Sequence, residues 1–174
     1  MNKDKLKIAA IIPGLLLIFG CSSSYPPLET VDTVDVNKYL GKWYEIARLP
    51  NSFQKECDCT TAEYSLIDST TIRVINKCLK NGETDEANGK AFVVDGSNNS
   101  KLRVQFFWPF RGDYWIIALD KETYNYAVVG TPSRKYLWIL ARTTELKENT
   151  LQNLISFAKE RGFDTSRLIF TKHY

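Results

Sequence analysis

The chain has 174 residues, of which 44% are hydrophobic and 25% are charged, and its formal net charge at pH 7 is +3. This length fits one domain, and the composition excludes a disordered chain and a polytopic membrane protein. Nine Phe, nine Tyr and four Trp make up 13% of the residues, whereas the single His is the penultimate residue, His173. A His-based zinc site, a Ser-His-Asp triad and a Cys-His dyad each need an imidazole within the fold, so we expect no metal, no cofactor and an apolar pocket.

The N-terminal segment has the pattern of a secretory signal peptide. Three basic residues, Lys3, Lys5 and Lys7, precede an uncharged apolar run at residues 8–19. A bilayer-spanning helix needs about 20 apolar residues, so this run is short for a transmembrane helix. We therefore expect residues 1–20 to be a signal peptide.

The end of this segment resembles the lipobox of bacterial lipoproteins, in which a small residue precedes the Cys at the cleavage point. Here Gly20 precedes Cys21. The resemblance implies that Cys21 becomes the acylated N-terminus, whereas the alternative is a plain signal peptide with a fortuitous Cys. Ser22, in place of an Asp, implies sorting to the outer membrane of a Gram-negative cell. Residues 21–34 are then expected to form a lipidated tether that holds the protein at the bilayer.

Cleavage before Cys21 changes the charge of the protein. The first 20 residues contain three Lys and one Asp, so their removal lowers the net charge from +3 to +1. A protein this close to neutral lacks the basic footprint of nucleic-acid binding. We expect no nucleic-acid partner.

Short runs of β-branched and aromatic residues recur about every 10 to 12 residues from Trp43 onward, separated by Asp, Asn, Gly, Ser and Pro. The expected strands lie near residues 43–48, 60–67, 72–79, 87–95, 101–108, 114–120, 125–131 and 136–142. Short connections favour antiparallel neighbours, and closure removes the two exposed edges of such a sheet. The pattern therefore predicts an all-β fold, an eight-stranded antiparallel up-and-down β-barrel.

One segment has helical spacing. Leu151, Leu154, Ile155 and Ala158 fall at i, i+3, i+4 and i+7. A single apolar stripe predicts one C-terminal α-helix that packs against the outside of the barrel. A short ninth strand is expected at residues 167–171, and the barrel domain is expected to cover residues 35–174.

The tripeptide Gly41-Lys42-Trp43 resembles the Gly-x-Trp signature of the lipocalins. The further segments 61–66, 74–77, 106–110, 114–120, 136–142 and 162–164 resemble the bacterial outer-membrane lipoprotein lipocalins, relatives of apolipoprotein D. The resemblance extends from about residue 35 to residue 170. It implies that Gly41, Trp43 and Arg142 are structural, with the Arg142 guanidinium across the Trp43 indole at the closed end of the barrel. It also implies that the ligand is a long-chain fatty acid or a lysophospholipid.

Alternate residues of each strand should face the lumen. The candidate ligand contacts are Tyr64, Leu66, Val74, Phe92, Val94, Leu102, Val104, Phe106, Trp115, Ile117, Tyr126, Val128 and Trp138. The sequence leaves undecided which of these side chains point into the lumen, because a register slip of one residue inverts every assignment. As a set they predict an apolar cavity that suits an acyl chain. Four basic residues in or near loops are candidate polar groups at its mouth: Arg48, Lys55, Arg111 and Arg134.

An apolar loop tip at residues 108–110 would line the entrance of this cavity or touch lipid. A membrane anchor would place the entrance close to its lipid supply. The sequence leaves open which lipid is bound and whether the chain forms a homodimer.

Three Cys remain if Cys21 is lipidated, and a disulfide is expected outside the cytoplasm. In a hairpin that turns near residues 68–71, Thr61 falls roughly opposite Cys78, so Cys59 is a nearer partner for Cys78 than Cys57. We therefore predict a Cys59–Cys78 disulfide, with Cys57–Cys78 as the alternative. The remaining thiol would be reactive, couple two chains, or be buried and inert.

These observations favour a membrane-anchored lipid-binding protein of the outer membrane, without enzymatic activity, that stores or transports fatty acids or lysophospholipids in the cell envelope. One alternative is an isomerase or hydrolase on the same scaffold, using the spare thiol or a lumen carboxylate such as Glu45 or Glu63. No base, nucleophile and orienting group are recognisable together for it. A further alternative is an envelope interaction protein whose barrel is filled by its own side chains.

Overall fold

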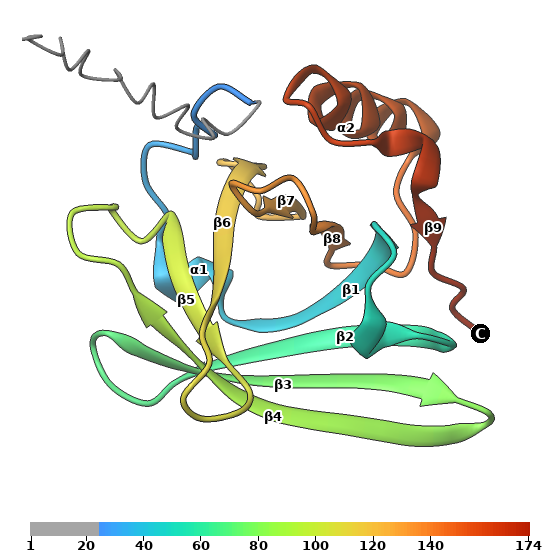
Figure 1. Cartoon of the computed structure of the whole chain (residues 1–174), viewed down its shortest axis with the longest axis horizontal. Helices are drawn as coiled ribbons and strands as arrows, with labels where there is room; N and C mark the ends of the chain where they lie inside the picture. Colours follow the sequence, from blue (N-terminus) through green and yellow to red (C-terminus); the bar gives the residue numbers. More distant parts are fainter. Residues whose placement is uncertain (1–24) are drawn as a thin grey trace, which may run out of the picture.

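A computed structural model describes residues 25–174 of the chain (Figure 1). The predicted signal peptide, at residues 1–20, and the predicted lipidation site, Cys21, lie outside the described residues. The tether predicted for residues 21–34 is wrong over its last part, because Leu28 and Val34 are buried against the barrel. The backbone N–H of Val31 also donates to the carbonyl oxygen of Ile116, at 3.0 Å. These residues are therefore part of the folded domain.

Within residues 25–174 the chain forms one nine-stranded sheet. The strands are β1 (Gly41–Arg48), β2 (Cys57–Leu66), β3 (Thr71–Lys80), β4 (Glu83–Val93), β5 (Lys101–Gln105), β6 (Gly112–Leu119), β7 (Tyr126–Gly130), β8 (Leu137–Ala141) and β9 (Ile169–Phe170). They pair in the order β2-β3-β4-β5-β6-β7-β8-β1-β9, and an additional pairing of β1 with β2 closes the sheet. All of these pairings are antiparallel. The predicted eight-stranded up-and-down β-barrel is confirmed, with β9 as an extra strand beside β1.

The long helix lies outside the barrel, as predicted (Figure 1). This helix is α2 (Glu148–Glu160), and its Leu154 and Ala158 pack against the wall of the barrel. The other helical segments are α1 (Val36–Tyr39), η1 (Ser52–Gln54) and η2 (Thr165–Arg167). None of the helices in residues 25–174 combines the length and the apolarity that crossing a membrane requires.

Local sequence explains the longest hairpin of the barrel. Ten residue pairs join β3 to β4, from Thr71 opposite Phe92 to Lys80 opposite Glu83. Asn81 and Gly82 connect the two strands with φ angles of 54° and 83°. Asn and Gly tolerate positive φ, and a two-residue turn of this kind matches the twist of the flanking strands. The hairpin therefore reaches well to one side of the molecule (Figure 1).

One end of the barrel is filled by α1 and by the indole of Trp43, which makes a hydrogen bond and a cation–π contact. Trp43 is fully buried, and its ring nitrogen donates to the carbonyl oxygen of Tyr39 at 2.8 Å. The Arg142 guanidinium lies 3.9 Å from the centroid of the Trp43 ring. It also donates to the carbonyl oxygens of Lys42 and Lys38, at 2.8 and 2.7 Å. Arg142 thus ties the helix and β1 together across the indole, in the arrangement that the family resemblance implies.

Gly41 allows this close approach. Its φ angle is +87°, which side chains with a Cβ rarely adopt, and the guanidinium of Arg142 lies 3.6 Å from the position that a Cβ would take. The residue therefore has the structural role expected of it.

Three buried tyrosines fill the interior next to this end. The hydroxyl of Tyr114 is hydrogen-bonded to those of Tyr39 and Tyr64, each at 2.8 Å. Burial raises the pKa of Tyr64 to about 12. Burial likewise holds the pKa of Tyr39 and of Tyr114 well above the ordinary value for tyrosine. The fold therefore requires these three phenols to stay neutral.

The disulfide joins Cys57 to Cys78, with a Cα–Cα distance of 5.4 Å, so the predicted Cys59–Cys78 pairing is wrong. The reason is an irregularity of β2 between Asp58 and Thr61, where Cys59 has a φ angle of 50°. Thr61 lies opposite Lys77, in a ladder that runs unbroken from Leu66 opposite Ile72, and beyond the irregularity Cys57 and Asp58 lie opposite Lys80 and Leu79. Cys59 is a free, half-buried thiol.

The two cysteines of β2 should therefore respond differently to substitution. The disulfide closes a loop with a sequence separation of 21. Replacing Cys57 with Ser should lower the free energy of unfolding by about 3 kcal/mol, whereas Cys59→Ser should change it by less than about 1 kcal/mol. Urea denaturation of the two variants measures this difference. An equal loss in both variants, or a larger loss in Cys59→Ser, would contradict the pairing.

Burial of the three tyrosines predicts that the folded protein loses stability at alkaline pH. Their folded pKa values lie above the unfolded value of about 10, so the stability that neutral phenols contribute is complete below about pH 10. It is lost as the pH rises toward 12, the folded pKa of Tyr64. Tyrosinate absorbance and circular dichroism, followed together, should show part of the ionisation only as the barrel unfolds.

A matched variant isolates this contribution. Tyr64→Phe keeps the ring, so it should cost only about 1 kcal/mol at neutral pH and make the alkaline decline in stability shallower. Complete ionisation of all tyrosines before any loss of structure would show that the three phenols are not buried as described.

Candidate functional site

The predicted ligand contacts divide between the two faces of the barrel wall. The interior apolar cluster, which also contains Trp43, includes six of them: Tyr64, Val74, Leu102, Val104, Phe106 and Trp138. The outer apolar cluster, which lies beneath α2, includes four others: Trp115, Ile117, Tyr126 and Val128. For these four residues the predicted position in the lumen is wrong. They form the surface on which α2 packs.

Strand β6 presents Trp115 and Ile117 to the outer cluster by simple alternation, and an irregularity adds Ala118 to the same face. The register with β7 shifts between Ile116 and Ala118, so that Ile117 and Ala118 both belong to the outer cluster. Tyr114, two residues before Ile116, therefore faces the interior, and it is a buried member of the interior cluster that the sequence reasoning missed. Strict alternation counted from Trp115 selects the wrong face of this strand.

The three remaining candidates belong to neither the interior nor the outer cluster. Phe92 falls between Ala91 and Val93, which both belong to the interior cluster, and it carries the Arg111 guanidinium 4.0 Å from its ring centroid. Phe92 therefore points outward, contrary to the prediction. Leu66 ends β2 and is 45% exposed. Val94 follows the end of β4 and belongs to neither cluster.

A buried polar cluster lies at the other end of β1, away from the end that Trp43 fills. Glu45 and Arg48 form an ion pair of 2.8 Å, and their side chains are 3% and 4% exposed. The bulge in β1 between Glu45 and Ala47 turns both side chains inward, opposite Leu140 and Trp138 of β8. Arg48, predicted as a solvated group at the mouth, is instead buried.

Gln54 of η1 connects this cluster to the interior. Its amide donates to the Glu45 carboxylate at 2.7 Å, and its side-chain oxygen accepts from the indole of Trp138 at 2.9 Å. Arg48 in turn donates to the carbonyl oxygen of Gln54 at 2.8 Å. The Nε atom of Arg48 is buried without a hydrogen-bond partner. One donor of the cluster is therefore free to bind an acceptor.

An aromatic rim surrounds this end. Phe53 is 62% exposed, and its ring centroid lies 5.7 Å from that of Tyr136 and 6.4 Å from that of Trp138. Tyr136 and Trp138 stack on one another with centroids 6.0 Å apart. The loop from β1 to β2 supplies Phe53, the loop from β7 to β8 supplies Tyr136, and Trp138 lies in β8; the two loops leave the same end of the barrel. An exposed aromatic rim beside an apolar interior suits the entry of an apolar chain.

The other basic residues proposed for the mouth have different roles. Arg134 is buried, and it donates to the carbonyl oxygens of Pro26, Pro132 and Arg161 at 2.7, 2.6 and 2.9 Å. It therefore fixes the start of the described chain to the loop between β7 and β8. Lys55 and Arg111 are exposed.

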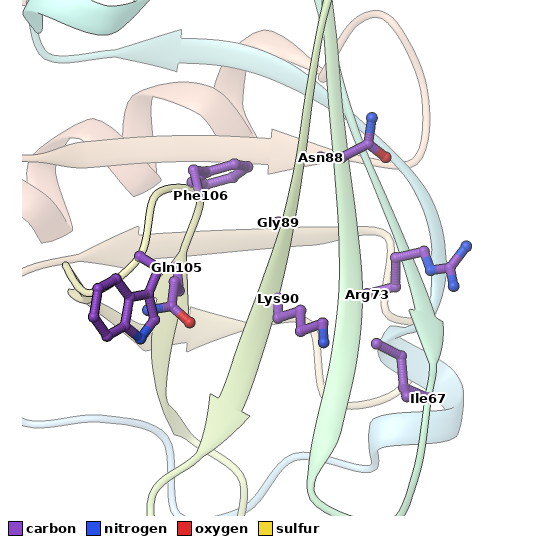
Figure 2. A pocket seen from close by; sticks show the side chains of 8 residues that line it. Ile67, Arg73, Asn88, Gly89, Lys90, Gln105 and Phe106 are labelled. Carbon is purple, nitrogen blue, oxygen red and sulfur yellow. The ribbon is translucent and has the colours of Figure 1, made fainter.

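Two hollows open on the surface of residues 25–174. One, of about 430 Å³, is lined by Ile67, Arg73, Asn88, Gly89, Lys90, Gln105, Phe106 and Trp108. Figure 2 shows Asn88, Gly89 and Lys90 along one strand, with Arg73 and Ile67 to one side and Gln105 and Phe106 to the other. The second, of about 540 Å³, is lined by Arg48, Glu56, Cys57, Asp58, Leu79, Asn81, Gly82, Ile169 and Tyr174. In the described part of the chain, no three His, Cys, Asp or Glu side chains gather as metal ligands would.

Known proteins share this architecture and much of the sequence. The outer membrane lipoprotein Blc of Vibrio cholerae is 43% identical over 159 residues, which cover 90% of this chain and 93% of that protein. Temperature-induced lipocalin-1 of Arabidopsis thaliana is 40% identical over 150 residues, covering 81% and 80% of the two chains. The structure of insecticyanin from the tobacco hornworm Manduca sexta superposes with a TM-score of 0.71 at 24% identity, over 86% of each chain.

These comparisons agree with the geometry. The localisation predicted from the sequence, the outer membrane, is the one that the names of the bacterial relatives state. The family model of the lipocalin-like domain matches residues 34–173, which span the whole barrel and its helix. The chain belongs to the lipocalin-like family.

Proposed function

We propose that this chain is a membrane-anchored lipid-binding protein that stores or transports fatty acids or lysophospholipids in the cell envelope. One observation carries the proposal: an apolar interior that is sealed at one end by Trp43 and Arg142 and bordered at the other by exposed aromatic side chains. Each buried methylene of an acyl chain would contribute about 0.8 kcal/mol in such an interior. A long apolar chain is therefore the ligand that this shape favours.

The polar cluster at the other end of β1 supports an amphipathic ligand. An acyl chain that enters beside Trp138 carries its headgroup past the Glu45–Arg48 pair. Fatty acids and lysophospholipids both have an anionic oxygen that can accept from the unpartnered Nε of Arg48. A headgroup that does not bind Arg48 would stay in water at this end of the barrel. This combination favours a lipid with one polar end over a wholly apolar guest.

The membrane anchor is the second part of the proposal. Bacterial relatives are named outer membrane lipoproteins, and the Gly20-Cys21 pair has the character of a lipidation site. We propose that the mature chain begins at an acylated Cys21 and stays at the outer membrane. Its lipid ligands would then come from the surface to which it is attached.

An enzymatic role is less well supported. The carboxylate of Glu45, one candidate for acid-base chemistry, accepts from Arg48, Gln54 and Thr171. These three donors give the carboxylate a structural role in the cluster. The relatives are named as lipoproteins and lipocalins. We therefore propose binding without bond chemistry.

Two neighbouring residues of β5 test the function. Val104 belongs to the interior cluster, whereas Arg103 pairs with Asp113 on the outside at 3.2 Å. Val104→Trp should fill the space of an acyl chain and weaken binding at least about tenfold, whereas Arg103→Trp, which adds the same indole outside, should leave affinity within about twofold. Calorimetric titration of the delipidated protein with a long-chain fatty acid and with a lysophospholipid measures both.

Two results would overturn the proposal. Absence of saturable binding of either lipid by the folded wild-type protein would favour a barrel filled by its own side chains. Equal affinities of the Val104→Trp and wild-type proteins would place the bound lipid outside the barrel. Circular dichroism of each variant establishes that the barrel is intact.

A further inference from the structure

The loop between β5 and β6 exposes three large aromatic side chains. Phe107 is 78% exposed, Trp108 86% and Phe110 77%. None of them belongs to the interior or the outer apolar cluster of residues 25–174. Three aromatic rings within four consecutive positions form an apolar patch rather than scattered surface residues. Such a patch stabilises nothing within the fold, so it indicates an interaction surface.

Cationic side chains lie beside this loop. Arg73 and Lys90 are exposed and line the same hollow as Trp108, and Figure 2 shows Lys90 on the strand next to Gln105 and Arg73 on the strand beyond it. Arg111 ends the loop, and its guanidinium rests 4.0 Å from the ring centroid of Phe92. None of the four ion pairs within residues 25–174 uses Arg73, Lys90 or Arg111. These charges are therefore available to an anionic partner.

The combination fits the interface of a bilayer that contains anionic lipid. Trp and Phe bury apolar area at the level of the headgroups, and Arg and Lys stay at that level and attract anionic phosphates. Lys is depleted at protein–protein interfaces, whereas Lys90 lines the same hollow as Trp108. The exposed rings and the free cations point to lipid.

The position of the loop relative to the chain start also favours the membrane. The loops from β5 to β6 and from β7 to β8 join strands at the same end of the barrel. Arg134 of the second loop holds Pro26 through a 2.7 Å hydrogen bond. Cys21 precedes Tyr25 by four residues, which span at most about 14 Å. A lipid on Cys21 therefore keeps this end of the barrel close to the bilayer.

The start of the described chain, next to the proposed lipid anchor, and the β5–β6 loop lie apart from each other. In Figure 1 the described chain starts beside α2 and the β7–β8 loop, whereas the β5–β6 loop lies on the opposite side of the view. One lipid anchor alone leaves a barrel free to tilt about it. A second contact across the rim would fix its orientation.

We infer that the loop from Phe106 to Arg111 is a second membrane contact, which inserts its aromatic side chains into an anionic bilayer and holds the open end of the barrel against the surface. The inference rests on the proposed anchor at Cys21, but not on which lipid the barrel carries. In this arrangement Arg73, Lys90 and Arg111 face the phosphates. The entrance then opens toward the membrane and not toward the aqueous phase.

Depth-dependent quenching of Trp108 tests this inference. The full-length lipidated protein is reconstituted into vesicles of phosphatidylethanolamine and phosphatidylglycerol, in which part of the phospholipid carries bromine on its acyl chains. Bromine quenches only an indole that approaches the acyl region. We expect brominated vesicles to remove a large part of the wild-type fluorescence and Trp108→Phe to abolish at least about two thirds of that quenching, because Trp43, Trp115 and Trp138 lie in the barrel wall or its interior.

A matched control places an indole at the other end of the barrel. Glu122 is exposed in the loop from β6 to β7, so Glu122→Trp in the Trp108→Phe background presents a solvent-facing indole away from the proposed contact. We expect this variant to show no added quenching. A double variant, Arg73→Gln with Lys90→Gln, tests the role of the cations. It should reduce the quenching of Trp108 at least about threefold in the anionic vesicles and change it little in phosphatidylcholine vesicles.

Three results would overturn the inference. These are no quenching of the wild-type protein, quenching that Trp108→Phe leaves unchanged, or equal quenching of the indole at position 122. The second result would locate the bromine near Trp138, as expected for brominated lipid carried as cargo. Calorimetric titration of Trp108→Phe with fatty acid separates the two proposals, because lipid binding in the barrel should survive loss of the membrane contact.

Discussion

The stack of the Arg142 guanidinium on the Trp43 indole is the contact on which the rest of this barrel depends. An eight-stranded barrel converges at one end, and a large flat side chain is needed to fill the space there. Trp43 fills it completely, and Arg142 covers the indole while tying together the carbonyl oxygens of α1 and β1. A cation over an indole that is shielded from water contributes about 2 kcal/mol. This contact holds one end of the barrel together without any contribution from the opposite end.

The two ends of the barrel therefore have different chemistry. At the sealed end, three phenols bond to one another and stay neutral because burial raises their pKa values. At the opposite end, the same strands carry the Glu45–Arg48 pair and the aromatic rim around Trp138. Packing energy is concentrated where the protein must be rigid. Exposed rings and an unpartnered donor are left where a ligand or a bilayer can use them.

Much of this fold could be predicted from the sequence because its signals are local. Alternating apolar runs located all eight barrel strands, and the spacing of Leu151, Leu154, Ile155 and Ala158 located α2. The family resemblance located Trp43 and Arg142. Each of these features depends on neighbouring residues or on a recognisable segment, so no knowledge of the tertiary structure was needed.

Some of the errors come from irregular strand registers, and others from counting the alternation of a regular strand from the wrong residue. The irregularity in β2 falls at Cys59, which does not pair with Cys78, whereas Trp115 and Ile117 of β6 lie on the outer face by simple alternation with Tyr114 and Ile116. A shift in β1 buried Arg48. A bulge adds one residue to a strand and inverts every facing beyond it, and it leaves no clear mark in the pattern of apolar residues. Tyr39 was missed for another reason, because it lies in a short helix before the barrel and joins the interior only through the folded arrangement.

A double-mutant cycle on Trp43 and Arg142 tests the central claim most directly. The free energy of unfolding by urea is measured for the wild type, Trp43→Phe, Arg142→Met and the double variant. The stack predicts a coupling energy of about 1 to 2 kcal/mol, so that Arg142→Met costs less once the indole has been removed. A coupling energy near zero would show that the two residues act independently and that their contact does not seal the barrel.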